Sequence, residues 1–220
     1  MPSSKRGFTL IELLIVIGVL AILATLTVLV INPAEYLARS RDSRRLTDLR
    51  IVNQALSIAV ARTAIMGKTL DQDGPQNGTS EDTCAGGANQ TIYVSVPASE
   101  PAPTPPPGWA YGQTSQTNLY RVDGTGWLPV DFIGTFANDL PPLPKLPVDP
   151  VNTFTSGYYY AYVCGSFELS TRFESDKFQS QTTEDGGDKS SYFEIGTNLT
   201  VTPIIYAPEN KSDLCADGED

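Results

Sequence analysis

The chain has 220 residues, 18 of them glycine and 17 proline, and it contains no histidine. This length suits one ordinary domain with a sizeable core, and the turn-rich composition favours strands over a helical bundle. Without histidine, Ser-His-Asp triads, histidine general bases and most zinc sites are excluded. Residues 1–68 carry nine lysines or arginines against four acids, whereas residues 69–220 carry six against twenty-one. The acidic second part would repel nucleic acid and anionic lipid, so we expect no direct nucleic-acid partner.

The first predicted element is an apolar helix. Residues 13–31 read LLIVIGVLAILATLTVLVI, nineteen residues without a charge. At about 1.5 Å per residue, a helix of this length crosses the ~30 Å hydrocarbon layer of a membrane. A secretory signal would place a small-residue cleavage site after the run, but INPAEYLARSRD follows it. The sequence therefore predicts a membrane helix that is retained.

The residues before the apolar run suggest a different cut. Lys5, Arg6 and Gly7 precede Phe8, so cleavage after Gly7 would remove a hydrophilic leader and create an amine on Phe8. Glu12 lies close behind, and a charge inside a bilayer costs roughly 2.5 to 3.5 kcal/mol unless it finds a partner. The Phe8 amine of the same chain and that of a neighbouring chain are both feasible partners. Only the second pairing would fix the axial stagger between subunits.

The stretch KRGFTLIELLIVIGVLAILA resembles the processing and methylation segment of type IV prepilins and of the pseudopilins of type II secretion. A basic leader, a glycine, a phenylalanine and a glutamate five residues after the cut occur in that fixed order. The resemblance implies cleavage between Gly7 and Phe8 by a membrane prepilin peptidase and N-methylation of Phe8. It also implies assembly into a helical filament in which Glu12 faces a neighbour's N-terminus.

The balance of charges on the two sides of the apolar run argues against an exported head. The segment after the apolar run is more cationic than the leader, and by the positive-inside rule it would stay in the cytoplasm. We give the prepilin resemblance more weight, because it is more specific and because the acidic, turn-rich remainder is typical of an exported domain. The charges concerned are Arg39, Arg41, Arg44, Arg45 and Arg50 against Glu35, Asp42 and Asp48.

The second predicted element continues the helix after an interruption. Asn32 and Pro33 predict a kink or local melting, because proline removes an intrahelical hydrogen bond. An apolar stripe follows and ends near Gly67, so this half is expected to pack against a sheet. Its arginines are interpreted either as a solvated face or as partners for acids of neighbouring subunits. The stripe comprises Leu46, Leu49, Val52, Leu56 and Val60, widened by Ile51, Ala55, Ile58 and Ile65.

The remainder reads as strands joined by turns. TIYVSVP at 91–97 alternates as a half-buried strand and leads into a proline-rich surface connection. NLYRVDGTGWLPVDF predicts two short strands around a DGTG turn, and YYYAYV with FELSTRF predicts a hairpin. Tyr158, Tyr160 and Tyr162 share one face of that hairpin. Cross-strand packing is the favoured use of this face, with a ligand platform as the alternative.

Cysteines and acids supply the remaining candidate sites. Cys84, Cys164 and Cys215 are far apart and lack CxxC spacing, so neither a metal knuckle nor a thioredoxin-like pair is indicated. In an exported domain we expect one disulfide from two of the three, with the pairing open. Asp185 and Asp188 in EDGGDKSSYFE are candidate calcium ligands, although an acidic turn is the simpler interpretation. No cofactor is expected.

These features predict an α+β fold like that of type IV pilins. A long N-terminal helix, membrane-spanning in its first half and amphipathic in its second, would pack against an antiparallel β-sheet head. The expected division is a leader at 1–7, a filament-core helix at 8–31, an amphipathic half at 32–67 and a β-rich head at 68–220.

The resemblance implies a structural subunit, a pilin or pseudopilin, and not an enzyme. The implied partners are further copies of the chain or minor pilins, the prepilin peptidase, and the pilus assembly platform with its ATPase. The precursor would lie in the cytoplasmic membrane with its head outside, and the assembled protein in an extracellular filament or pseudopilus. The alternative is a single-pass anchored protein whose extracellular head binds a ligand through the tyrosine face.

Overall fold

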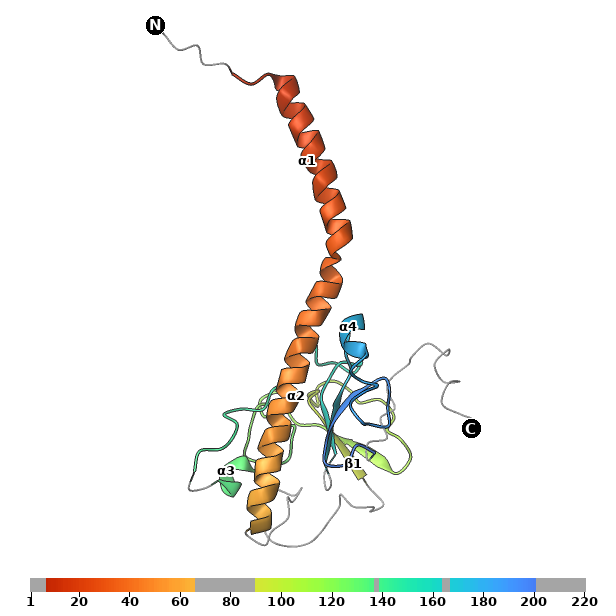
Figure 1. Ribbon diagram of the computed structural model, residues 1–220. Coiled ribbons are helices and arrows are strands. Elements are labelled where there is room, and N and C mark those ends of the chain that lie inside the picture. The colour runs from red at the N-terminus through yellow and green to blue at the C-terminus, as the bar shows by residue number, and fades with distance from the viewer. Residues whose placement is uncertain (1–6, 66–89, 137–138, 164–166, 201–220) are drawn as a thin grey trace, which may run out of the picture.

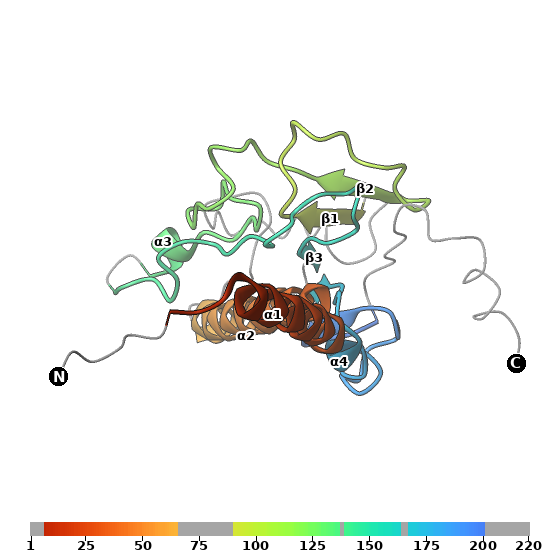
Figure 2. The ribbon, with the colours of Figure 1, turned by 90° about the horizontal axis from the view of Figure 1, so that it is seen from above.

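The computed structural model describes residues 7–65, 90–136, 139–163 and 167–200. Helix α1 projects away from the head, whereas most of α2 runs along it, with α4 beside the upper part of α2 and α3 beside its lower part (Figure 1). Seen from above, strands β1 to β3 lie to one side of α2 (Figure 2). The elements are α1 (Leu10–Ile31), α2 (Pro33–Ile65), β1 (Gln90–Val94), β2 (Trp109–Gly112), α3 (Phe132–Thr135), β3 (Ala161–Val163), β4 (Glu168–Thr171), α4 (Asp176–Gln179) and β5 (Phe193–Gly196).

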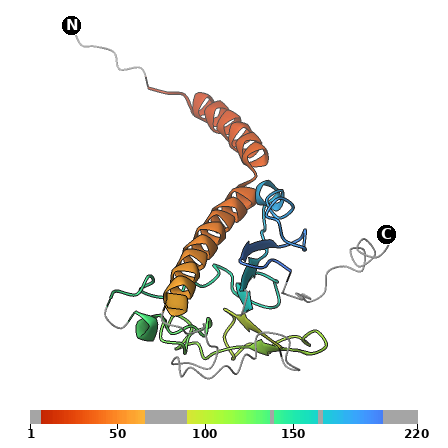
Figure 3. The same ribbon diagram turned by 60° about the horizontal axis from the view of Figure 1, so that its bottom comes forward.

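The long helix is interrupted at the predicted point. Asn32 ends α1 in the left-handed conformation, with φ of 43°, and α2 begins at Pro33. Proline suits the first position of a helix because it has no N–H to satisfy there. The Asn32 carbonyl accepts the Tyr36 N–H at 3.3 Å, so this residue closes one helix and opens the next. The resulting change of direction between α1 and α2 is visible in Figure 3.

The five strands form one mixed sheet in the order β2-β1-β3-β4-β5. Strand β1 pairs with β2 in parallel and with β3 antiparallel, and β3-β4 and β4-β5 are antiparallel. The α+β, type IV pilin-like architecture is therefore confirmed, whereas a fully antiparallel sheet is wrong. A parallel pair needs a connection of roughly a dozen residues or more, which the proline-rich segment between β1 and β2 supplies. Strand β2 lies at the end of that segment and was not predicted.

The predicted strands around the DGTG turn are also wrong. The turn forms, with Gly124 at φ of 83° and Asp123 Oδ1 accepting the Thr125 N–H at 3.2 Å. Its flanks share one isolated bridge, between Asp123 and Asp131, and neither flank forms a strand. The physical reason is burial, since Trp127 and its neighbour Leu128 both enter the core and leave no alternation of faces.

The main core lies between α2 and the sheet. The amphipathic prediction for α2 is confirmed in its central stripe, but Ile51 and Ile58 are 43% and 50% exposed. These two isoleucines are one heptad apart on the outer face of α2, so they do not widen the stripe. The side chain of Ile65 lies outside the described residues. The buried α2 positions in the core are Leu49, Val52, Ala55, Leu56 and Ala59, with Leu46 and Val60 packed against them.

Two of the three tyrosines of the predicted face, Tyr160 and Tyr162, belong to this core, whereas Tyr158 is half-buried with its ring 4.7 Å from the Arg45 guanidinium. Strands β3 and β4 pair as expected, and Tyr160 and Tyr162 are both buried in the cluster that contains the α2 stripe. The Tyr160 hydroxyl donates to Asp48 Oδ2 of α2 at 2.9 Å, and its ring lies 6.2 Å from that of Trp127. Core packing is therefore the use that the structure supports. The buried rings of Tyr160 and Tyr162 cannot contribute to an exposed ligand platform.

Replacing Tyr160 with phenylalanine should lower the free energy of unfolding by about 0.5 to 1.5 kcal/mol, the usual net value of one hydrogen bond. Burial raises the pKa of Asp48 and the Tyr160 hydroxyl opposes that rise. Removing the hydroxyl would therefore leave this carboxylate less well solvated. Urea titration of the full chain in detergent measures the loss. Tyr120→Phe, at a 44% exposed ring, is the matched control and should change nothing. Equal urea midpoints for Tyr160→Phe and Tyr120→Phe would show that the hydrogen bond from Tyr160 to Asp48 does not stabilise the fold.

Candidate functional site

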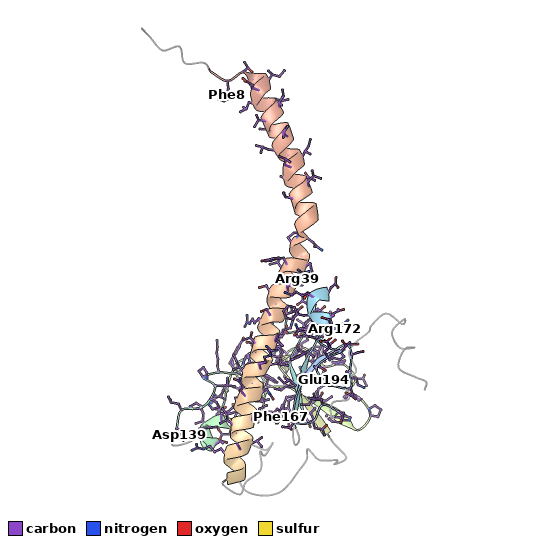
Figure 4. All side chains as sticks on the ribbon, in the orientation of Figure 1. Phe8, Arg39, Asp139, Phe167, Arg172 and Glu194 are labelled. Atoms are coloured by element: carbon purple, nitrogen blue, oxygen red, sulfur yellow. The ribbon has the colours of Figure 1, made fainter. Side chains whose placement is uncertain are left out.

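The segment around the predicted cleavage point is open to solvent. Gly7, Phe8 and Thr9 are exposed and precede the first helical residue, Leu10. Nothing lies within 4 Å of a Cβ built on Gly7. Phe8 stands at the end of α1 farthest from the head (Figure 4). The peptide bond between Gly7 and Phe8 is thus in non-helical, accessible backbone, which a peptidase active site requires.

Glu12 forms a reciprocal cap with Thr9 at the start of α1. The Thr9 N–H and hydroxyl both donate to Glu12 Oε2, each at 3.0 Å, and the Glu12 N–H donates to Thr9 Oγ1 at 3.2 Å. Such a capping box satisfies two amide donors that the first helical turn leaves open. In the full chain, the carboxylate is therefore held by the residue next to Phe8, whose nitrogen would become the new amine if the chain were cut after Gly7. The sequence did not predict Thr9, although the spacing TxxE is the known signature of this box.

Helix α1 has the properties of a membrane span. It contains one window, Leu10–Thr27, that is long and apolar enough to cross a bilayer, and none of that window is buried against the rest of the protein. Its two threonine hydroxyls are satisfied internally, since Thr25 donates to the Ala21 carbonyl at 2.8 Å and Thr27 to the Leu23 carbonyl at 3.0 Å. Internal satisfaction of polar groups is what a lipid environment demands. An apolar helix exposed in this way needs lipid or other protein around it.

A buried ionic cluster fastens α2 to the head. The Arg45 guanidinium is fully buried, and its Nε and Nη2 donate to the two Asp149 oxygens at 2.6 and 3.1 Å. Its Nη1 donates to Asp42 Oδ1 at 2.7 Å, and Nη2 lies 2.6 Å from Glu174 Oε1. Burial alone would lower the pKa of Arg45, but hydrogen bonds and charges from Asp149 and Asp42 outweigh it and the pKa is raised. The guanidinium therefore stays charged within the protein.

The remaining contacts of the cluster join the same two regions. Arg41 Nε donates to the Glu174 oxygens at 2.9 and 3.0 Å. Burial would raise the pKa of Glu174, but the hydrogen bonds from Arg41 and Arg45 prevail and the pKa is lowered. Asp42 Oδ2 accepts the N–H and hydroxyl of Ser175 at 2.8 and 2.6 Å. The solvated-face interpretation is thus wrong for Arg45, which is buried, and both Arg41 and Arg45 pair with acids of their own chain.

The other candidate residues are three cysteines and two aspartates. Cys84, Cys164 and Cys215 all lie outside the described residues. Asp185 accepts backbone N–H groups of Gly187 and Glu194, each at 2.8 Å, and Asp188 pairs with Lys189 at 3.4 Å. Among the described residues, no group of three or more acids or cysteines is arranged to hold a metal. We therefore assign no metal ligand here.

Comparison with known proteins identifies the N-terminal segment. Residues 2–28 match the family model described as the prokaryotic N-terminal methylation motif, the signature of type IV prepilins and pseudopilins. No curated protein and no solved structure matches the chain. Residues 2–28 therefore carry a prepilin signature, and they lie at the start of an α+β fold with an apolar N-terminal helix. The signature points to a structural subunit that is made as a membrane-anchored precursor.

Proposed function

We propose that the protein is a pilin or pseudopilin, a structural subunit of a type IV pilus-like filament. The observation that carries this proposal is the accessible Gly7-Phe8 bond directly before a capped, fully exposed apolar helix, within the matched methylation motif. A prepilin peptidase would remove residues 1–7 and leave N-methylated Phe8 as the first residue. Residues 8–31 would form the filament core, 32–67 the amphipathic half of the helix, and 68–220 the surface head.

Assembly would exchange one apolar environment for another. Lipid tails are as apolar as leucine side chains, so moving α1 from a bilayer into a bundle of α1 helices has little hydrophobic cost. The assembly platform and its ATPase would supply the work of extraction. Glu12 would then contact the Phe8 amine of a neighbouring copy, and this contact would select one axial register because a buried charge accepts few positions.

The ionic cluster supports a role for α2 in transmitting the force of extraction to the head. A subunit extracted through its N-terminal helix must carry its head along, and Arg45 joins α2 to Asp149 and Glu174 of the head through buried contacts. The precursor would sit in the cytoplasmic membrane with its head outside, and the mature protein in the filament, alone or with minor pilins. The alternative is an anchored monomer that binds a ligand through the tyrosine face. It is less well supported, because Tyr160 and Tyr162 of that face are buried and Tyr158 is half-buried.

N-terminal sequencing and intact mass of protein sheared from cells test the proposal. We expect filamentous material whose first residue is N-methylated Phe8. The mass would lack residues 1–7 and gain one methyl group. Surface-exposed protein that begins at Met1 or Pro2 and stays with the membrane after shearing would overturn the proposal in favour of the anchored monomer.

A further inference from the structure

Two buried glutamates lie side by side on the sheet face that points away from α2. Ser170 of β4 is directly opposite Glu194 of β5, and Glu168 lies two residues from Ser170, on the same face. Leu169 and Phe193 occupy the other face and belong to the core that includes α2. The side chains of Glu168 and Glu194 are 0% and 1% exposed. Figure 4 places Glu194 within the head.

The loop between α4 and β5 covers this pair. The Lys189 N–H donates to Glu194 Oε2 at 3.1 Å, and the Glu194 N–H donates to Asp185 Oδ2 at 2.8 Å. A Cβ added to Gly187 would stand 1.8 Å from Glu194 Oε2, so the loop backbone rests directly on the carboxyl group. The loop is therefore held against the sheet by its contacts to Glu194.

The charges around Glu194 are mostly negative. Glu168 faces it from β4, and Asp185, Asp188 and Lys189 face it from the covering loop. The ammonium group of Lys189 pairs with Asp188 Oδ2 at 3.4 Å. Glu194 Oε1 is buried and accepts no hydrogen bond from the described residues. Two ionised carboxylates in such a place would be strongly disfavoured.

The charge of Glu168 acts on Glu194 and adds to the rise that burial causes in its pKa, so the two carboxyl groups are close enough to interact. Two ionised carboxylates buried together have no donor between them, whereas a proton on one of them would remove the repulsion and supply a donor. We propose that Glu168 and Glu194 share one proton, and that this proton latches the α4-β5 loop onto the sheet. Loss of the proton places a second negative charge beneath the loop, breaks the carboxyl-carboxyl bond and releases the loop.

The pH range of the latch follows from the pKa of Glu194. Burial raises this pKa from 4.5 to about 8, and the negative charges of Glu168 and Asp188 add to the rise. The folded state therefore binds a proton more tightly than the unfolded state does. The stabilisation is complete below pH 4.5 and is lost as the pH rises through about 8. Across that range, the equilibrium constant for folding should fall by up to about tenfold per pH unit.

The test uses the full chain in detergent and compares wild type with Glu194→Gln and Glu184→Gln. A glutamine amide at 194 can donate to Glu168, so it imitates the protonated state, whereas Glu184 is exposed on the same loop and serves as the control. Infrared spectroscopy at pH 7 should show the C=O stretch of a protonated carboxylic acid in wild type and Glu184→Gln but not in Glu194→Gln. The urea midpoint should fall between pH 5 and pH 9 in the first two proteins and change much less in Glu194→Gln.

Three outcomes would overturn the shared proton. The first is a wild-type spectrum at pH 7 without the carboxylic-acid band, which needs no variant to fold. The second is a wild-type pH slope retained in Glu194→Gln. The third is a urea midpoint at pH 8 that calcium or magnesium raises in wild type but not in Glu194→Gln, because that result would assign the pair to a cation instead.

Discussion

Replacing Arg45 with methionine should lower the free energy of unfolding of the head by about 3 to 5 kcal/mol, the usual cost of removing one partner from a buried ion pair. The loss is large because Asp42 and Asp149 would keep their burial without their cation. Glu174 would still pair with Arg41, so its carboxylate should contribute less to the loss of stability than those of Asp42 and Asp149. Urea titration of the full chain in detergent, followed by near-ultraviolet circular dichroism, measures the effect.

Arg39→Met is the matched control for Arg45. Arg39 pairs with Glu35 one turn away on the same helix, with its side chain 46% exposed. Exposed pairs of this spacing contribute about 0.3 to 0.5 kcal/mol. Arg45→Lys should fall between the two methionine variants, because an ammonium keeps the charge but cannot form the paired contacts to Asp149. A loss for Arg45→Met no greater than that for Arg39→Met would show that the cluster does not hold α2 to the head.

Replacing Glu12 with glutamine should leave cleavage intact but reduce the filament yield by at least about tenfold, equivalent to roughly 1.4 kcal/mol of lost contact energy. A glutamine oxygen can still accept the hydrogen bonds from Thr9, so the cap at the start of α1 is kept. What disappears is the negative charge available to a neighbour's Phe8 amine. The variant therefore separates helix capping from pairing between subunits.

The Glu12 experiment is read from two fractions of the same cells. The mass of membrane protein reports cleavage, and the protein in the sheared fraction reports assembly. Glu35→Gln is the control, since Glu35 lies beyond the apolar helix and pairs with Arg39 of its own chain. Filaments at the wild-type level from Glu12→Gln would rule out the charge contact. Loss of cleavage as well would mean that Glu12 acts at the peptidase and not in assembly.

The sequence predicted elements whose signal is local. The uncharged run predicts α1 without any periodicity, Pro33 fixes the break, and the alternation around Tyr160 and Tyr162 predicts the β3-β4 pairing. Hairpin strands are close in the chain, so their own residues specify the partner. The same reasoning failed for β2, because a parallel pairing is decided by the path of a long connection that carries no repeating pattern of its own.

Contacts between residues that are far apart in the chain could also not be predicted from the sequence. Arg45 lies 104 positions from Asp149 in the chain, and a run of arginines and acids on a helix does not reveal which of them will be buried. Glu168 sits in a stretch that alternates like any half-exposed strand, so nothing indicates that the loop after α4 will close over its neighbour Glu194. The capping box of Thr9 and Glu12 was predictable in principle, since both residues are contiguous and the spacing is known.

Folding also changes how the charge of the segment after α1 is presented. The arginines after α1 oppose export when they are counted along the chain. In the folded protein, Arg39 pairs with Glu35, Arg44 with Asp48, Arg41 with the half-buried Glu174, and Arg45 with the buried Asp42. Little positive charge is then presented where the chain leaves the bilayer. Folding therefore neutralises most of this cationic segment, whereas the unfolded nascent segment would present its charge uncompensated to the insertion machinery.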